Sequence, residues 1–398
     1  MSETGKPSQP AQPAKPAASP AAAAAAAAAR AAAAAMPAAP APAAAAAADT
    51  GKVINPQADA NRIGMTRADY GGSKSTLCIG CGHDQITRHI ITATYESGVD
   101  PYNVAKTSGI GCSSKTGAYF INKGYGINAV HGRMPSIATG AAMANKHLVV
   151  LGVSGDGDTA SIGIGQFMHA VRRNTNMTYI VENNGVYGLT KGQFSATSDK
   201  GARIKSGETN DYADIDLCQM ALDLGCGFVA RSFSGDAKQM VALIRAAINH
   251  RGFALIDAIS PCVTFNNLPD STKGFAWLKQ HNVTLHELGF VAPYDAVSIE
   301  QEPGTTKVVD MPDGSHIVLH KLAEAEHDPT NRRAALELLA KDKADPGHVV
   351  TGLIYYDPAS NLPLEDMKHL PDQSLATMTE AQLRPTREQF TQILAAYR

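Results

Sequence analysis

An acidic loop and a later pair of amides combine oxygen ligands with backbone that bends easily. The loop is Gly155-Asp156-Gly157 and the pair is Asn183-Asn184. Magnesium prefers oxygen ligands and is usually held by one or two side chains together with the phosphates of a bound molecule. Asp156 supplies an anionic oxygen and Asn184 a neutral one, while the two glycines let the backbone approach a phosphate closely. The pattern therefore predicts a site for a magnesium-bound diphosphate.

The elements that precede these loops indicate where such a site would lie. Each loop follows a short apolar run typical of a strand, at residues 148–153 and 177–181. The carboxyl ends of parallel strands share one edge of an open α/β sheet, and ligands bind at that edge. A helix beginning near Ser161 would direct its free N–H groups at a phosphate. The arrangement resembles the diphosphate-binding motif of thiamine diphosphate enzymes, with two unrelated turns as the competing interpretation.

Four of the six cysteines lie in contexts that suggest metal binding. Cys78 and Cys81 share the loop LCIGCGH, and Cys112 and Cys262 each follow a predicted strand. Four thiolates brought together bind either tetrahedral zinc or an iron–sulfur cluster. A neighbouring thiamine-dependent oxidation favours iron, because that reaction needs an electron acceptor and a closed zinc site is redox-inert.

Short apolar runs alternate with helical patterns from about residue 70 to residue 262. Strands are expected at residues 103–109, 148–153, 177–181, 228–233 and 253–260, and helices at 86–97, 136–147, 164–174, 216–225 and 236–252. This alternation predicts an α/β fold with a doubly wound parallel sheet covered by helices on both faces. Cys218 and Cys226 fall in or at the end of a helical pattern and are expected to be core residues.

The pattern changes after about residue 270. A hairpin is expected at residues 307–322 with Asp313-Gly314 as its tight turn, followed by a charged helix at 331–342 and an apolar run at 349–358. We interpret residues 271–398 as a small α+β extension with a packing role. The cofactor-binding domain is then expected over residues 61–270, preceded by a tail over residues 1–60.

The tail has a composition that cannot form a core. Residues 1–50 contain no Leu, Ile, Val, Phe, Tyr or Trp and consist mostly of Ala and Pro. Such a segment buries too little apolar surface to offset its ordering entropy, so we expect it to be disordered. It does not have the pattern of a secretory signal, because its alanine run lacks a Leu-type centre and is interrupted by Arg30. A transit peptide is the other alternative, although such a segment should be rich in Arg and Ser, unlike this one.

Charge and hydropathy exclude several classes of protein. The net charge of −2 over 398 residues offers no electrostatic case for binding nucleic acid or an anionic membrane. The sequence contains no run of eighteen strongly apolar residues, so no membrane span is expected. With no export signal indicated, we expect a cytoplasmic protein that binds neither nucleic acid nor membrane.

Over about residues 65–300 the chain resembles the β subunits of 2-oxoacid:ferredoxin oxidoreductases, most of all the 2-oxoglutarate branch. The resemblance is carried by the motifs CIGCGHD, SGIGCSS, HGR, GDGD, ENNGVYGLTKGQ and SPCVTFN. It implies conversion of 2-oxoglutarate and CoA to succinyl-CoA and CO₂, with electrons passing to ferredoxin. A pyruvate or broad-range 2-oxoacid enzyme is the alternative within the family. A zinc-stabilised scaffold subunit is the alternative outside it.

The resemblance also implies roles for individual residues. One 4Fe–4S cluster would be ligated by Cys78, Cys81, Cys112 and Cys262. Mg²⁺ would be held by Asp156, Asn184 and the backbone carbonyl of Val186. Thiamine diphosphate would lie against Ile110, Gly111, Cys112, Ser113, His131, Gly157, Asp158, Gly188 and Leu189. For His131, a structural loop histidine is the alternative.

Two lysines near the same sheet edge are candidates for binding the carboxylates of the substrate. Lys115 follows the Cys112 loop and Lys191 follows the Asn183-Asn184 loop. 2-Oxoglutarate has two carboxylates, and a charge-assisted hydrogen bond to each contributes about 1.5–3 kcal/mol. Pyruvate-specific relatives look to have glycine in place of Lys191, which favours 2-oxoglutarate. The competing interpretation is two solvated surface lysines.

The resemblance implies that this chain acts with partners. The glutamate that assists the cofactor's aminopyrimidine in thiamine enzymes would lie on an α subunit, which would also carry the CoA site. We therefore expect an αβ or (αβ)₂ assembly. The four-cysteine runs of a ferredoxin domain are not seen, so the cluster would pass electrons to an external ferredoxin.

Overall fold

A computed structural model describes residues 60–293, 307–319, 327–345, 347–359 and 362–397. The tail predicted to be disordered lies outside the described residues, except for Ala60. Among the helices of the described ranges, none is both long and apolar enough to cross a membrane.

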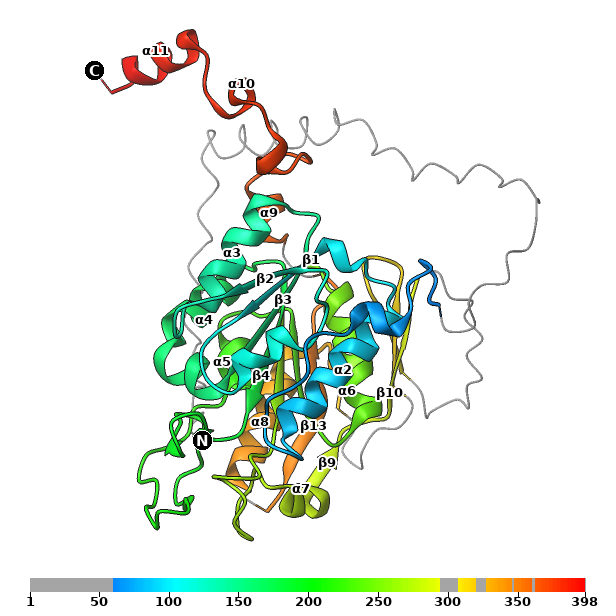
Figure 1. The fold of residues 1–398 in the computed structure, drawn as a ribbon, viewed down its shortest axis with the longest axis vertical. Helices are drawn as coiled ribbons and strands as arrows, with labels where there is room; N and C mark the ends of the chain where they lie inside the picture. Colours follow the sequence, from blue (N-terminus) through cyan, green and yellow to red (C-terminus); the bar gives the residue numbers. More distant parts are fainter. Residues whose placement is uncertain (1–59, 294–306, 320–326, 346, 360–361, 398) are drawn as a thin grey trace, which may run out of the picture. The chain divides into compact units, whose positions relative to one another are not determined.

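An eight-stranded sheet forms the centre of the fold, in the order β2-β1-β3-β4-β8-β7-β13-β9 (Figure 1). The strands from β2 through β7 in this order all pair in parallel, whereas β13 is antiparallel to β7 and parallel to the edge strand β9. Their bounds are β1 Val104–Ser108, β2 Tyr125–Asn128, β3 Val149–Gly155, β4 Met177–Asn183, β7 Phe228–Phe233, β8 Phe253–Ile259, β9 Asn282–Thr284 and β13 Val349–Tyr356. The predicted doubly wound parallel sheet is confirmed.

Helices cover both faces of this sheet. On one face the core includes α2 (Gly82–Glu96) and α6 (Ala237–Asn249). On the other face lie α3 (Met134–Ala144), α4 (Ile164–Arg172), α5 (Leu217–Asp223) and α8 (Arg332–Ala344). The central strands β4 and β8 are buried along their whole length, because a parallel strand covered on both faces needs a nearly continuous apolar run. Cys218 and Cys226 are buried in this core, as predicted.

The part of the chain beyond residue 270 contributes to two sheets. It supplies β9 and β13 to the main sheet and the strands of a three-stranded sheet, β10-β12-β11. In the latter, β11 (Lys307–Asp310) and β12 (His316–Leu319) form the predicted hairpin, and β10 is Leu288–Val291. Gly314 has a φ of 82°, as the tight turn requires. The last residues of the predicted hairpin, 320–322, lie outside the described residues.

The remaining elements are short. They are η1 Arg67–Tyr70, η2 Pro101–Asn103, η3 Ser113–Ala118, η4 Gly157–Ile162, β5 Val186–Tyr187, β6 Gln193–Phe194, α7 Phe275–His281, α9 Leu364–Met367, η5 Leu375–Thr377, α10 Glu380–Leu383 and α11 Arg387–Ala395. One expectation needs correction here. The helix expected to start near Ser161 is preceded by the π-helical turn η4, so helical backbone begins at Gly157, next to Asp156.

Candidate cofactor site

Asp156 and Asn184 lie together at the carboxyl edge of the sheet. Asp156 directly follows β3 and Asn184 directly follows β4. The two strands are parallel neighbours, with Gly155 opposite Glu182, so their loops meet. The backbone N–H of Asn184 lies close enough to the Asp156 carboxylate to lower its pKa. The structure therefore brings the two predicted magnesium ligands side by side.

The Asp156 carboxylate is buried and held by hydroxyl groups. Its Oδ2 atom accepts hydrogen bonds from the Ser195 hydroxyl and from Thr197 Oγ1, the latter at 2.8 Å. Burial raises the pKa of the Asp156 carboxyl, because neutral donors compensate a buried charge less than a cation does. This donor set fits a bound Mg²⁺, which would supply the missing positive charge.

Sequence reasoning missed Ser195 and Thr197. They lie on the far side of the short β5–β6 hairpin, which folds the chain back over the loop that carries Asn184. The spacing of two between the hydroxyl residues was the available signal, since alternate residues of an extended segment face the same side. Without knowledge of the hairpin, that signal identifies no partner.

Asp158 connects three segments of the site. Its carboxylate accepts hydrogen bonds from the backbone N–H of Ile110 at 3.2 Å and from that of Gly132 at 2.8 Å. It also contacts the His131 ring at Nδ1 and accepts a hydrogen bond from Ser154 Oγ. The segments around Ile110 and His131, both expected to line a cofactor, are thus tied to the residues that follow β3.

Two glycines in this region have no space for a side chain. A Cβ on Gly109 would lie 1.8 Å from Asp158 Oδ2, and one on Gly157 would lie 2.5 Å from a ring carbon of Tyr187. The Tyr187 hydroxyl donates to the carbonyl of Gly157 at 3.1 Å, and its ring centroid is 6.4 Å from that of His131. Glycine is therefore required at both positions so that the Asp158 and Tyr187 side chains can pack directly on the backbone.

The four candidate cluster ligands come from three segments that lie together. The backbone N–H of Gly82 donates to the carbonyl of Pro261, which joins the Cys78–Cys81 loop to the Cys262 segment. Burial raises the pKa of the Cys112 thiol, and the nearby Cys262 and Cys78 sulfurs raise it further, as Cys262 also does for Cys81. Within the described ranges, no three side chains of the His, Cys, Asp or Glu type are arranged to hold one metal ion.

The surroundings of the sulfurs suit thiolates that bind a positively charged centre. Phe265 N–H donates to Cys262 Sγ at 3.3 Å, and Thr264 Oγ1 lies 3.5 Å from Cys78 Sγ. Cys81 is the N-cap residue of α2, and the backbone N–H groups of the first turn of that helix lie close enough to oppose the rise in its pKa. Burial nevertheless raises the pKa of the Cys81 thiol to about 12. Such a group becomes a thiolate when a metal centre compensates its charge. This donor set fits the expected iron–sulfur cluster.

A buried acid–imidazole pair lies among these loops and was also missed. Glu182, at the end of β4, accepts hydrogen bonds from Thr116 Oγ1, and its Oε2 atom is 3.6 Å from His83 Nδ1. Burial raises the pKa of Glu182 well above its usual value and lowers that of His83 to about 4. The His83 imidazole is therefore neutral near pH 7. His83 Nε2 lies 3.4 Å from Asn184 Nδ2, which connects the pair to the loop that carries Asn184.

The two candidate substrate lysines differ in their surroundings. Lys115 is partly buried, and its charge acts on the Cys112 thiol. Lys191 is exposed and has a φ of 80°, in the left-handed region that favours glycine. A non-glycine residue in this conformation costs about 1–3 kcal/mol, and such costs cluster at functional sites.

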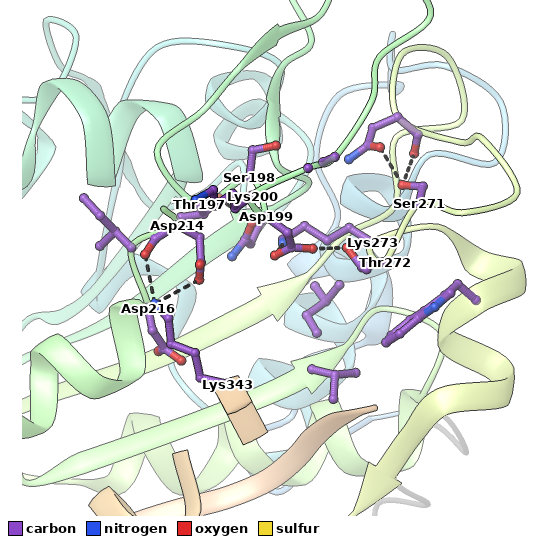
Figure 2. A pocket seen from close by; sticks show the side chains of 18 of the residues that line it. Thr197, Ser198, Asp199, Lys200, Asp214, Asp216, Ser271, Thr272, Lys273 and Lys343 are labelled. Carbon is purple, nitrogen blue, oxygen red and sulfur yellow. Dashed lines mark hydrogen bonds and ion pairs between the residues drawn. The ribbon is translucent and has the colours of Figure 1, made fainter. Parts of the chain in front are cut away.

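A polar cavity of about 440 Å³ lies beside the end of β4 (Figure 2). Asn183 and Thr197 line it beside the site, and Lys273 pairs with Asp199 at 3.0 Å across it. Thr197 also contacts Asn183 Oδ1, and Asn183 Nδ2 donates to Asp257. A line of hydrogen bonds thus runs from Asp156 into this cavity.

At the far end of this line, one buried arginine binds three carboxylates. Arg231 contacts Asp216 at 2.7 Å, Asp257 at 3.2 Å and Asp342 at 2.9 Å. Burial opposes the ionisation of Asp216, yet Arg231 holds the pKa of that carboxyl below its usual value. The cluster joins β7 and β8 to α5 and to α8.

Replacing Arg231 with methionine is expected to lower the free energy of unfolding by about 3–5 kcal/mol, because three buried carboxylates lose their counter-charge. Urea denaturation of the full-length chain measures this effect. The control is Arg203→Met, which breaks an ion pair to Asp270 in which both side chains are more than half exposed. The control should leave stability nearly unchanged. Equal effects of the two variants would contradict a structural role for the cluster.

Comparison with known proteins assigns the fold to a class. Residues 109–258 match the family described as "Thiamine pyrophosphate enzyme, C-terminal TPP binding domain". This range contains β3 and β4 and the loops that carry Asp156, Asp158 and Asn184. The chain thus contains a thiamine pyrophosphate-binding domain.

Similar proteins define the family more narrowly. The chain is 36% identical over 221 residues to the 2-oxoglutarate synthase subunit KorB of Methanocaldococcus jannaschii, covering 53% of this chain and 79% of that protein. It is 43% identical over 192 residues to a 2-oxoacid:ferredoxin oxidoreductase subunit beta of Saccharolobus solfataricus, covering 48% of this chain and 63% of that subunit. The chain belongs to the β subunits of the 2-oxoacid:ferredoxin oxidoreductases. It spans a little under two thirds of the length of some of these relatives.

A solved structure supports the same relationship. It is a 2-oxoglutarate:ferredoxin oxidoreductase from Magnetococcus marinus with 2-oxoglutarate, coenzyme A and succinyl-CoA bound. The match has a TM-score of 0.63 at 29% identity and covers 84% of this chain and 96% of the other. The recognised family and the fold class expected from the sequence are thereby confirmed.

Proposed function

We propose that this chain is the β subunit of a 2-oxoglutarate:ferredoxin oxidoreductase. In this role it would act with CoA to form succinyl-CoA and CO₂ and would pass electrons to ferredoxin. The observation that carries the proposal is the meeting of the Asp156–Asn184 pair with the cysteine segments at one sheet edge. Relatives named for 2-oxoglutarate and a solved neighbour with 2-oxoglutarate bound favour this substrate.

The residues of the edge would divide the work of holding the cofactors. Asp156, Asn184 and the carbonyl of Val186 would hold Mg²⁺. Gly157, Asp158, Gly188 and Leu189 would contact the diphosphate, and Ile110, Gly111, Cys112, Ser113 and His131 would line the rest of the cofactor. When bound, thiamine diphosphate supplies the electron sink for loss of CO₂.

The four cysteines would place a 4Fe–4S cluster next to this cofactor. Cys112 serves both sites in the proposal, because its segment is tied to Asp158 through Ile110, and its sulfur lies 3.5 Å from the position that a Cβ on Gly188 would take. Electrons would therefore cross a short distance within the chain. An external ferredoxin would receive them.

An α subunit is part of the proposal. It would supply the glutamate that assists the cofactor and the CoA site, in an αβ or (αβ)₂ assembly. Lys115 and Lys191 would each bind one carboxylate of 2-oxoglutarate, where charge-assisted hydrogen bonds are strongest.

The test is electron paramagnetic resonance on the chain purified anaerobically with its partner, before and after addition of 2-oxoglutarate. A radical or reduced-cluster signal that depends on 2-oxoglutarate supports the proposal. A signal with pyruvate and none with 2-oxoglutarate, in protein replete with iron, contradicts the substrate assignment. Zinc without acid-labile sulfide would instead favour the scaffold alternative.

Lys191→Gly tests the substrate assignment directly. Loss of a charge-assisted hydrogen bond should lower kcat/KM for 2-oxoglutarate by about 10- to 100-fold, with a much smaller change for pyruvate. The fold should be as stable or more stable, because glycine adopts a φ of 80° without strain. Steady-state kinetics with both substrates and thermal denaturation measure the two effects.

The matched control is Lys205→Gly, which removes an exposed lysine from the loop after β6 and should leave both substrates unaffected. Equal losses of kcat/KM with 2-oxoglutarate and pyruvate in the Lys191→Gly variant would show that this lysine does not bind the second carboxylate.

A further inference from the structure

The chain ends in an arm without a buried core. The arm comprises residues 375–397, including η5, α10 and α11, and none of the residues in these three helices is buried. Figure 1 shows α10 and α11 following α9 at the C-terminal end of the chain, where no other labelled helix or strand packs on them. The hydrogen bonds of the arm to described residues are all local.

One face of α11 is apolar and exposed. Phe390, Ile393 and Leu394 follow the i, i+3, i+4 spacing that places side chains on one side of a helix, and Tyr397 lies two residues beyond the end of α11. Phe390, Ile393 and Leu394 are each about half exposed, and Tyr397 is almost wholly so. This spacing is how amphipathic helices anchor in an apolar groove of a partner.

The local sequence specifies the start of α11, although no residue of this helix is buried against the rest of the described chain. Thr386 caps the helix, because its hydroxyl accepts a hydrogen bond from the Gln389 backbone N–H. The Gln389 side-chain oxygen in turn accepts a hydrogen bond from the Thr386 backbone N–H. A helix of nine residues is nevertheless marginal in water on its own. Specific capping together with an unsupported apolar face indicates a segment built to pack on another molecule.

The arm leaves the fold on the side away from the candidate cofactor site. Leu364 in α9 donates to Asn174, Arg251 pairs with Asp366, and Lys146 pairs with Asp372 at 2.6 Å. Lys146, Asn174 and Arg251 immediately precede β3, β4 and β8, at the amino ends of those strands. A partner bound by the arm is therefore held at a point distinct from the carboxyl edge.

We infer that the arm docks α11 into an apolar groove of the α subunit, an inference that rests on the proposed function. Pairing with the arm of a second copy is disfavoured by size. A nine-residue helix is about 14 Å long, and a specific, stable interface buries roughly 1,200–2,000 Å². A small contact suffices when the partner is already bound elsewhere, because the second contact is then intramolecular. The α subunit meets that condition in both proposed assemblies, since it would complete the cofactor site at the opposite edge, whereas a second copy of this chain would meet it only in (αβ)₂.

The test uses the complex of the full chain with its α subunit. The double variant Phe390→Glu and Ile393→Glu places two charges on the apolar face. The control Thr391→Glu and Gln392→Glu adds the same charge elsewhere on α11. Native mass spectrometry across a dilution series measures the α:β ratio, and the rise in Tm with Mg²⁺ and thiamine diphosphate checks that each variant still folds.

We expect wild type and control to retain α equally, and the apolar-face variant to lose it with a dissociation constant raised at least about tenfold. Equal retention in all three proteins would overturn the inference. So would a variant that keeps a 1:1 ratio and falls only from (αβ)₂ to αβ, because the arm would then join copies. If the wild-type chain itself binds no α subunit, the proposed function fails first and this inference fails with it.

Discussion

Asp156→Ala is expected to abolish tight binding of thiamine diphosphate while leaving the fold intact. Removal of the one anionic ligand proposed for Mg²⁺ should lower cofactor affinity by more than about 100-fold, since even residues that only support metal ligands contribute 10- to 100-fold. The metal-free chain should be no less stable than wild type, because burial raises the pKa of this carboxyl and alanine removes the buried charge.

Thermal denaturation measures both expectations for Asp156. Wild type should show a rise in Tm when Mg²⁺ and thiamine diphosphate are added together, because a ligand that binds only the folded state stabilises it. The Asp156→Ala variant should lose that rise. Thr197→Val, which removes one hydrogen bond to the Asp156 carboxylate and keeps the ligand, should reduce it by an intermediate amount. A full rise in Tm in the Asp156→Ala variant would contradict the role proposed for this carboxylate in holding Mg²⁺.

Cys262→Ala is expected to abolish ferredoxin reduction while leaving the magnesium site functional. Three thiolates from the remaining segments would hold the cluster incompletely, so iron and acid-labile sulfide should fall severalfold in the purified complex. The rise in Tm with Mg²⁺ and thiamine diphosphate should persist, because Asp156, Asn184, Ser195 and Thr197 are unchanged.

The chain offers a matched control for this cysteine. Cys226 is fully buried, and its sulfur lies 3.2 Å from the carbonyl of Phe228 and 3.3 Å from that of Phe253 in the core. Cys226→Ala should retain iron, sulfide and ferredoxin reduction, with at most a loss of stability. Full activity in Cys262→Ala, or loss of iron in Cys226→Ala, would contradict the proposed ligand set.

The sheet could be predicted because each of its central strands has a local signature in the sequence. The runs at residues 148–153 and 177–181 are largely apolar, as expected for parallel strands covered on both faces, and both form central strands. Because parallel strands end at the same edge of a sheet, the same runs predict that Asp156 and Asn184 lie at one edge. The hairpin around Asp313-Gly314 was predictable for a similar reason, since a tight turn has a local signature.

The contacts that complete the site were not predictable, because they join residues distant in sequence. Thr197 reaches Asp156 through a hairpin of two-residue strands, which leaves almost no periodicity to recognise. Glu182 ends an otherwise apolar strand, but its partners Thr116 and His83 come from other loops. Likewise β13 joins the main sheet beside β7, a pairing that its own sequence does not specify.

The carboxylate of Asp158 has a consequence for the energetics of cofactor capture. Because one side chain accepts the amide protons of both Ile110 and Gly132, neither segment can shift without giving up a charged hydrogen bond. The walls of the site are thus set in position before any ligand arrives. Little conformational entropy remains to be lost on binding, so more of the contact energy appears as affinity.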